Sequence, residues 1–210
     1  MVDLGLLKAA VEAGDRAGAV ACTTAAVNEG QDPQEVLAAM TAAMDVVGRR
    51  FQNDEIFIPE MLISARAMKE ATAVLEPILT ASGIRPEHRA VIGTIRGDLH
   101  DIGKNLVGMM WRGANIEVVD LGTNVAPEQF VAAVREHDAG LVGVSALLTT
   151  TMVGMRDVVA AVHASGVDGV KVIVGGAPVT PDFAAQIGAD GYAADAASAV
   201  DVARAVLGIE

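Results

Sequence analysis

From Arg89 onward, short apolar runs alternate with helical patterns, and this alternation constrains the fold more than any other feature of the chain. The runs are rich in Val, Ile and Leu, which is typical of strands buried on both faces of a parallel sheet. Helices between such strands cover the two faces. We therefore predict an α/β domain with a flavodoxin-like, doubly wound Rossmann sheet. The strands are expected at 90–95, 116–121, 141–145, 170–174 and 191–194, and the helices at 102–112, 127–136, 152–164, 181–187 and 197–207.

The first part of the chain has helical periodicity and almost no strand pattern. Apolar residues recur at intervals of three and four, beginning with Leu4, and two later helices open at Asp32-Pro33 and Pro59-Glu60. We predict an N-terminal four-helix bundle as a cap domain over residues 1–85, followed by a Rossmann-like domain over residues 86–210. Pro77 is expected to kink or shorten the last helix of the bundle.

Charge and cysteine content exclude several classes of protein. The formal net charge of −12 argues against a nucleic-acid surface and against a polybasic membrane surface. Cys22 is the single cysteine, so no disulfide can form within the chain. The sequence shows no signal peptide and no apolar run long enough to span a membrane. We expect a cytoplasmic protein without nucleic-acid or membrane partners.

The motif Asp98-x-His100-x-x-Gly103 follows the first predicted strand of the sheet. One imidazole nitrogen can bind a metal while the Asp98 carboxylate holds the other and fixes the tautomer. One histidine is too few for a zinc site, which takes three or four protein ligands, but it suffices for a metal already held by a macrocycle. Without further support, the alternative is an ordinary surface histidine.

Two further features fit one bulky ligand near His100. In the predicted strand order, the loops after the first and third strands face each other, so the hydroxyl-rich stretch 145–151 should lie opposite His100. Glycines at the predicted strands would let a flat group approach the backbone closely. These glycines are Gly97, Gly122, Gly143, Gly175 and Gly176.

The ordered combination of Asp98-x-His100-x-x-Gly103, Ser145-x-Leu147 and Gly175-Gly176 resembles the corrinoid-binding proteins of cobalamin-dependent methyltransferase systems. It is also similar to the cobalamin-binding module of methionine synthase, and the resemblance covers essentially the whole chain. It implies cobalamin or a related corrinoid as the cofactor. His100 would be the lower axial ligand of cobalt and Asp98 its hydrogen-bond partner, and Thr151 would extend this relay where methionine synthase has a serine.

The resemblance also implies which residues surround the cofactor. Ser145 and Leu147 would line a slot for the nucleotide tail, and Gly103 would let its helix pack closely. In the cap domain, Phe51, Ile58 and Met61 would cover the upper face of the corrin, although they can equally be ordinary bundle core. The implied cofactor-binding residues of the Rossmann-like domain are Gly97, Asp98, Leu99, His100, Asp101, Ile102, Gly103, Ser145, Leu147, Thr149, Thr151, Gly175, Gly176, Tyr192 and Asp195.

The function implied by the resemblance is that of a methyl carrier. Cobalt would cycle between Co(I) and methyl-Co(III), loaded by a substrate-specific methyltransferase and unloaded by a second methyltransferase. The acceptor would be a C1 acceptor such as tetrahydrofolate or a thiol, and a reductive activase would be a third partner. The chain would not be catalytic without these enzymes. The donor stays open among methanol, methylamines, glycine betaine and methoxylated aromatics.

Three other classes of protein share parts of this pattern. A cobalamin-dependent sensor has a similar cap but usually an attached DNA-binding or effector module. The small cobalamin-binding subunit of a mutase shares Asp-x-His-x-x-Gly but generally lacks a cap of the Phe51/Ile58 type. A flavodoxin-like protein without a corrin leaves the ordered motifs unexplained.

Overall fold

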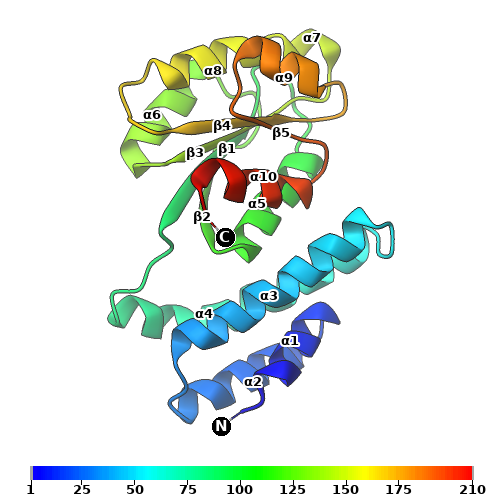
Figure 1. The fold of residues 1–210 in the computed structure, drawn as a ribbon, viewed down its shortest axis with the longest axis vertical. Helices are drawn as coiled ribbons and strands as arrows, with labels where there is room; N and C mark the ends of the chain where they lie inside the picture. Colours follow the sequence, from blue (N-terminus) through cyan, green and yellow to red (C-terminus); the bar gives the residue numbers. More distant parts are fainter. Residues whose placement is uncertain (1, 210) are drawn as a thin grey trace. The chain divides into compact units, whose positions relative to one another are not determined.

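The computed structural model describes residues 2–209 and shows two compact units. One unit contains the chain up to Pro86 together with Gly113–Asn115, and the other contains Glu87–Arg112 and the chain from Ile116 onward. The first unit is helical, and the second is a parallel sheet covered by helices (Figure 1).

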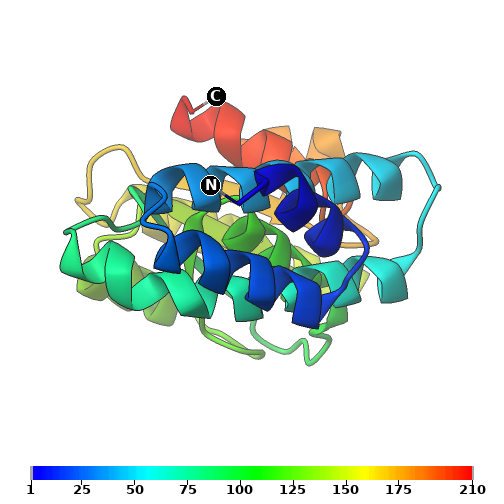
Figure 2. The same cartoon turned by 90° about the horizontal axis from the view of Figure 1, so that it is seen from below.

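The N-terminal unit consists of four helices, as predicted. They are α1 (Leu4–Glu12), α2 (Arg16–Asn28), α3 (Pro33–Gln52) and α4 (Ile58–Ala81). Helix α1 packs on α2 and α3, and α4 packs on α2 and α3 (Figure 2). Helices α1, α2 and α3 begin at aspartate caps whose carboxylates accept amide hydrogen bonds from the first turn. The caps are Asp3, Asp15 and Asp32.

Pro77 does not shorten α4, which continues through it to Ala81. That part of the prediction is wrong, and the burial pattern gives the reason. Proline removes the amide that would bond the carbonyl of Ala73, and both Ala73 and Pro77 are exposed, so water can satisfy this carbonyl. Leu75 and Leu79 are buried on the other side of the helix and hold its last turns in place.

The second unit has five parallel strands in the order β2-β1-β3-β4-β5, which confirms the flavodoxin-like topology. Observed and predicted boundaries differ by a few residues. The helix predicted at 152–164 is observed as α8 (Met155–His163), and a short helix before it, α7 (Thr149–Met152), was not predicted. The elements are β1 (His88–Thr94), α5 (Ile102–Gly113), β2 (Ile116–Asp120), α6 (Pro127–His137), β3 (Leu141–Ser145), α7 (Thr149–Met152), α8 (Met155–His163), β4 (Lys171–Gly175), α9 (Pro181–Ile187), β5 (Gly191–Ala193) and α10 (Ser198–Leu207).

Each face of the sheet buries one large aromatic ring over a strand glycine. Helices α6, α8 and α9 cover one face, where Phe130 lies 2.9 Å from the point a Cβ at Gly93 would occupy. Helices α5 and α10 cover the other face, where Trp111 lies 2.7 Å from the Cβ position of Gly143. Gly143 therefore makes room for Trp111, and the prediction that it admits a flat ligand is wrong.

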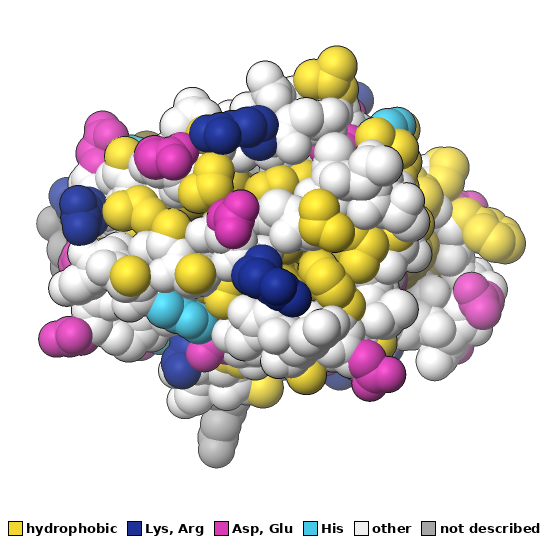
Figure 3. Space-filling view, turned by 90° about the horizontal axis from the view of Figure 1, so that it is seen from above, with side chains coloured by type: hydrophobic (Ala, Val, Ile, Leu, Met, Phe, Trp, Pro, Cys, Tyr) yellow, Lys and Arg dark blue, Asp and Glu magenta, His cyan; other side chains and the backbone are white. Residues whose placement is uncertain are grey.

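One face of the second unit carries charges of both signs. Lys and Arg side chains lie scattered among acidic and apolar ones on the face over α8 and α9 (Figure 3). Among the helices of residues 2–209, none has the length and apolarity that crossing a bilayer requires.

Asp190 ties β4 and β5 together at the amino-terminal edge of the sheet. Its carboxylate accepts hydrogen bonds from the Val172 amide at 2.8 Å and from Lys171 Nζ at 3.0 Å, and it lies 2.8 Å from His163 Nε2. Burial raises the pKa of Asp190, but these hydrogen bonds outweigh burial and lower the pKa below its ordinary value. The ionised form therefore stabilises the fold.

We expect Asp190→Asn to lower the free energy of unfolding by about 2 kcal/mol near neutral pH, because it weakens three polar contacts. The folded pKa lies below the unfolded value of about 4, so this stabilisation is complete above that value and is lost as pH falls through the folded pKa. Urea denaturation at several pH values should show the gap between wild type and variant closing in acid. Asp168→Asn, in an exposed turn, is the control, and a gap that stays constant with pH contradicts the prediction.

Candidate functional site

The site is built on the turn that follows β1. Gly97, with a φ of +84°, allows the chain to reverse, and the Asp98 amide closes the turn on the Ile95 carbonyl at 3.1 Å. The loop after β3 lies directly against this turn, because the Leu147 amide donates to the Asp98 carboxylate at 2.8 Å. The predicted meeting of the loops after the first and third strands is confirmed.

The Asp98 carboxylate is fully buried and is surrounded by hydrogen-bond donors. Its Oδ1 accepts from the His100 amide at 3.1 Å and lies 2.7 Å from His100 Nδ1. Its Oδ2 accepts from the amides of Leu147 and Leu148 at 2.8 and 3.3 Å and from Thr151 Oγ1 at 2.9 Å. Burial raises the pKa of Asp98, but the hydrogen bonds, led by that of Leu147, lower it far below its usual range. Asp98 is a carboxylate at neutral pH.

His100 presents one ring nitrogen outward. Because Nδ1 is held by Asp98, Nε2 is the nitrogen available to a ligand, and 52% of the side-chain surface is exposed. Within residues 2–209, no group of three or more His, Cys, Asp or Glu side chains converges to hold a metal ion. The site therefore offers a single oriented nitrogen, which suits a metal whose other ligands come from a macrocycle.

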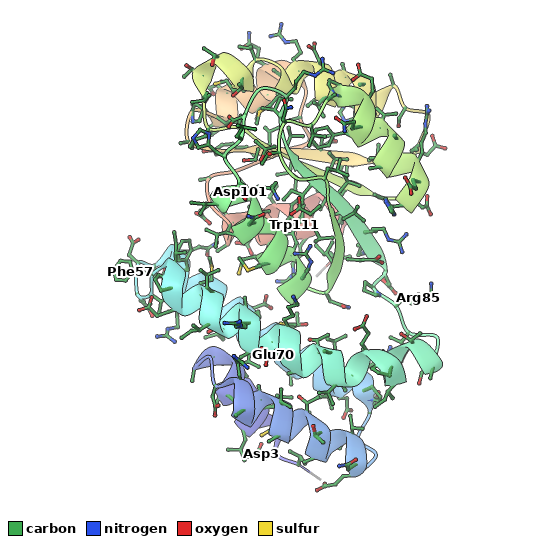
Figure 4. All side chains as sticks on the ribbon, turned by 180° about the vertical axis from the view of Figure 1, so that it is seen from behind. Asp3, Phe57, Glu70, Arg85, Asp101 and Trp111 are labelled. Atoms are coloured by element: carbon green, nitrogen blue, oxygen red, sulfur yellow. The ribbon has the colours of Figure 1, made fainter. Side chains whose placement is uncertain are left out.

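Apolar side chains stand exposed around His100. Leu99 and Ile102 are 74% and 73% exposed, and Leu147 and Leu148 from the opposite loop are also exposed. Asp101, at the start of α5, lies in the same exposed segment (Figure 4). Gly103 is exposed too, and nothing lies within 4 Å of a Cβ added there, so the prediction that Gly103 lets its helix pack closely is wrong. Apolar side chains exposed together in this way are typical of a ligand-binding surface.

Gly175 and Gly176, two residues predicted for the tail slot, have no room for a side chain in the protein itself. Gly176 has a φ of +126°, and a Cβ there would collide with the Ala146 carbonyl. At Gly175, a Cβ would approach the Ala193 carbonyl to 2.7 Å. Ser145 ends β3 between Thr94 and Gly175, and Thr149 is exposed at the start of α7. The structure thus brings these residues to the edge of the sheet that carries His100.

The two C-terminal candidates, Tyr192 and Asp195, lie farther along the chain. Tyr192 is half-buried in β5 and packs against the core. Asp195 holds the turn before α10, because its carboxylate accepts hydrogen bonds from the amides of Ala197 and Ser198 at 2.9 and 2.7 Å. These bonds give Asp195 a structural role in the turn.

The candidates of the helical unit differ in exposure. Ile58 is 40% exposed at the start of α4, and Phe57 beside it, which was not among the predicted site residues, is 67% exposed (Figure 4). Phe51 is half-buried near the end of α3. Met61 is buried, as the bundle-core alternative predicts.

Sequence reasoning missed four residues that hold the His100 loop. Asn124 Oδ1 accepts from the Gly97 amide at 2.8 Å, and Thr94 Oγ1 donates to the His100 carbonyl at 2.8 Å. Lys104 Nζ pairs with both carboxylate oxygens of Asp120 at 2.7 and 2.6 Å. The sequence offered one sign of the Lys104–Asp120 pair, namely a lysine directly after Gly103 and an aspartate at the end of an apolar strand.

The family models and known proteins that this chain resembles are named for B12, corrinoids or cobalamin. A B12 binding domain model matches residues 88–201, and a second B12 binding domain model matches residues 5–76. A corrinoid protein of Desulfitobacterium hafniense is 39% identical over 207 residues, which is 96% of each chain. A dimethylamine corrinoid protein of Methanosarcina acetivorans is 40% identical over 177 residues, 83% of each chain. A chain in the solved methanol:cobalamin methyltransferase complex from Methanosarcina barkeri superposes with a TM-score of 0.86 at 30% identity, covering 98% of this chain and 79% of that one.

We expect Asp98→Asn to lower the free energy of unfolding of the cofactor-free protein by about 2 kcal/mol or more, because an amide nitrogen cannot accept the donors that converge on one carboxylate oxygen. Urea denaturation measures the change. Asp101→Asn, at an exposed neighbour, should change stability by less than about 0.5 kcal/mol. Equal effects of the two substitutions would show that the Asp98 hydrogen bonds contribute little.

Proposed function

The chain belongs to the family of corrinoid proteins built from B12 binding domains, and from this premise we propose that it carries methyl groups on a bound corrinoid. The observation that carries the proposal is the buried Asp98 carboxylate, which orients His100 so that Nε2 faces outward. We propose that Nε2 is the lower axial ligand of cobalt.

The bound corrinoid would supply the cobalt that accepts a methyl group from one molecule and passes it to another. The chain supplies ligation and orientation. Asp98 keeps the Nδ1 side of His100 hydrogen-bonded, which fixes the tautomer that leaves Nε2 free. The Thr151 hydroxyl lies 2.9 Å from Asp98 Oδ2 and 3.0 Å from the Leu148 carbonyl, so its one proton has two acceptors. Thr151 can therefore direct this proton either to Asp98 or to the Leu148 carbonyl.

The remaining predicted residues would bind other parts of the corrinoid. Leu99, Ile102 and Gly103 would lie under the macrocycle, since they are exposed around His100. Ser145 and Leu147 would line the slot for the nucleotide tail, and Gly175 and Gly176 would give the tail room. Thr149 would lie at the lower side of the corrin. In the helical unit, we propose that Phe51 and Ile58 cover the upper face.

The partners follow from the role of a carrier. We propose a substrate-specific methyltransferase, a second methyltransferase that unloads cobalt to tetrahydrofolate or a thiol, and a reductive activase, all in the cytoplasm. Relatives named for dimethylamine and a structural neighbour named for methanol support methyltransferase partners and leave the donor of this chain open. The B12 binding domain match over residues 5–76 supports this role over that of a mutase subunit without a cap.

The test is the visible absorption spectrum of the purified protein after loading with hydroxocobalamin and methylcobalamin. We expect stoichiometric retention and a spectrum of histidine-bound cobalt, which His100→Ala should convert to the base-off form. Retention of no corrinoid overturns the proposed function. Identical spectra for the wild type and His100→Ala overturn the assignment of His100 as the ligand.

Substitution of Gly103 separates binding from folding. Gly103→Ala should leave the stability of the cofactor-free protein unchanged or raise it by up to about 1 kcal/mol, since alanine favours helices and no protein atom opposes its methyl group. The same methyl would face the corrin and raise the dissociation constant about tenfold or more. Gly108→Ala, buried on the same helix, is the matched control. Unchanged corrinoid affinity of Gly103→Ala would place the macrocycle elsewhere.

A further inference from the structure

The exposed segment that carries His100 lies between two buried charges. Residues 99–103 are all exposed, whereas Asp98 just before them and Lys104 just after them are 0% and 3% exposed. Among residues 2–209, these two are the charged residues that are buried. A buried charge is costly unless it is paired, so each marks a point where the chain is held firmly.

The Lys104 ammonium group is satisfied by partners on two elements. It donates to both carboxylate oxygens of Asp120, the last residue of β2, and to Asn105 Oδ1 at 2.7 Å. Asp120 Oδ1 also accepts from the Gly122 amide at 2.8 Å. Burial raises the pKa of Asp120, but the bond from Lys104 and the other contacts lower it, so Asp120 is ionised and the two groups form an ion pair.

The ion pair fixes the start of α5 against the end of β2. The Gly122 carbonyl accepts from the Thr94 amide at 2.9 Å, and Thr94 Oγ1 donates to the His100 carbonyl at 2.8 Å. The Lys104–Asp120 pair is thus connected to His100 through the end of β2 as well as through the chain. The Asp98 carboxylate sets the orientation of the ring, and Lys104 sets the position of the segment's other end.

We propose that Lys104, paired with Asp120, is a positioning residue. It would fix the end of segment 99–103 and so hold the His100 ring in place for binding cobalt. This inference rests on the proposed function of His100. A buried ion pair can often be replaced as a whole by apolar residues without loss of stability, so stability alone does not account for this pair. The ion pair instead fixes the position of the chain directly after segment 99–103, while the side chains of that segment stay exposed.

The test is Lys104→Met, which removes the ammonium group and preserves most of the volume. The variant is loaded with methylcobalamin, and the ratio of histidine-bound to base-off cobalt is read from the visible spectrum. Wild type and His100→Ala supply the two reference spectra. We expect the ratio to fall about tenfold or more in folded protein, with corrinoid affinity reduced no further than in His100→Ala.

Two further variants keep the test decisive. Lys104→Met with Asp120→Asn removes both charges and keeps a side-chain oxygen at position 120 that can accept from the Gly122 amide. It is the variant to use if the single substitution prevents folding, and its ratio should also fall. Lys171→Met breaks a second lysine–aspartate pair, with Asp190 at the opposite edge of the sheet, and should leave the spectrum unchanged. Circular dichroism and urea denaturation report folding separately from ligation.

The outcomes separate this inference from its premise. A wild-type spectrum that is base-off overturns the ligand role of His100, and the inference falls with it. A histidine-bound wild type together with folded Lys104 variants that keep the wild-type ratio overturns the inference alone. An affinity loss larger than that of His100→Ala, or failure of both Lys104 variants to fold, would show that Lys104 supports the whole site and would also overturn it.

Discussion

The structure of the site depends on one buried negative charge. An ionised carboxylate without access to water is unstable unless several donors surround it. The chain satisfies Asp98 with donors from two separate loops, those after β1 and β3. Because the amides of Leu147 and Leu148 are used in this way, the loop after β3 must run close to the His100 turn. The carboxylate therefore joins the loops as well as orienting the histidine.

The sheet beneath the site is held by very few aromatic residues, which make up 3% of the chain. Trp111 and Phe130 are fully buried on opposite faces, and each rests on a glycine in a central strand. This arrangement explains why glycine occurs inside β1 and β3 although it weakens strands in general.

Much of the fold was predictable from the sequence because the apolar strands and the helices between them leave few topologies. The Asp98–His100 pair was predictable because its members are two residues apart. The role of Gly143 was not, since glycine in a strand signals close approach of something, and only the packing shows that it is an aromatic ring. Contacts between different elements were the hardest to predict, as for Lys104 in α5 and Asp120 at the end of β2, which are 16 residues apart. Such pairs depend on how the helix packs beside the strand, and neither periodicity nor spacing in the sequence encodes that packing.

The contacts of Asp98 and Lys104 keep the apolar residues around His100 exposed. Leu99 and Ile102 would be a liability in a free-standing loop, since exposed apolar side chains favour nonspecific association. Here the residues on either side are anchored by buried ionic groups, so the segment cannot turn its apolar side chains inward. The fold thus keeps a small apolar surface open around one oriented imidazole nitrogen. A site prepared in this way loses little conformational freedom when a ligand binds, and this preorganisation favours ligation of a cofactor whose metal needs only one bond from the protein.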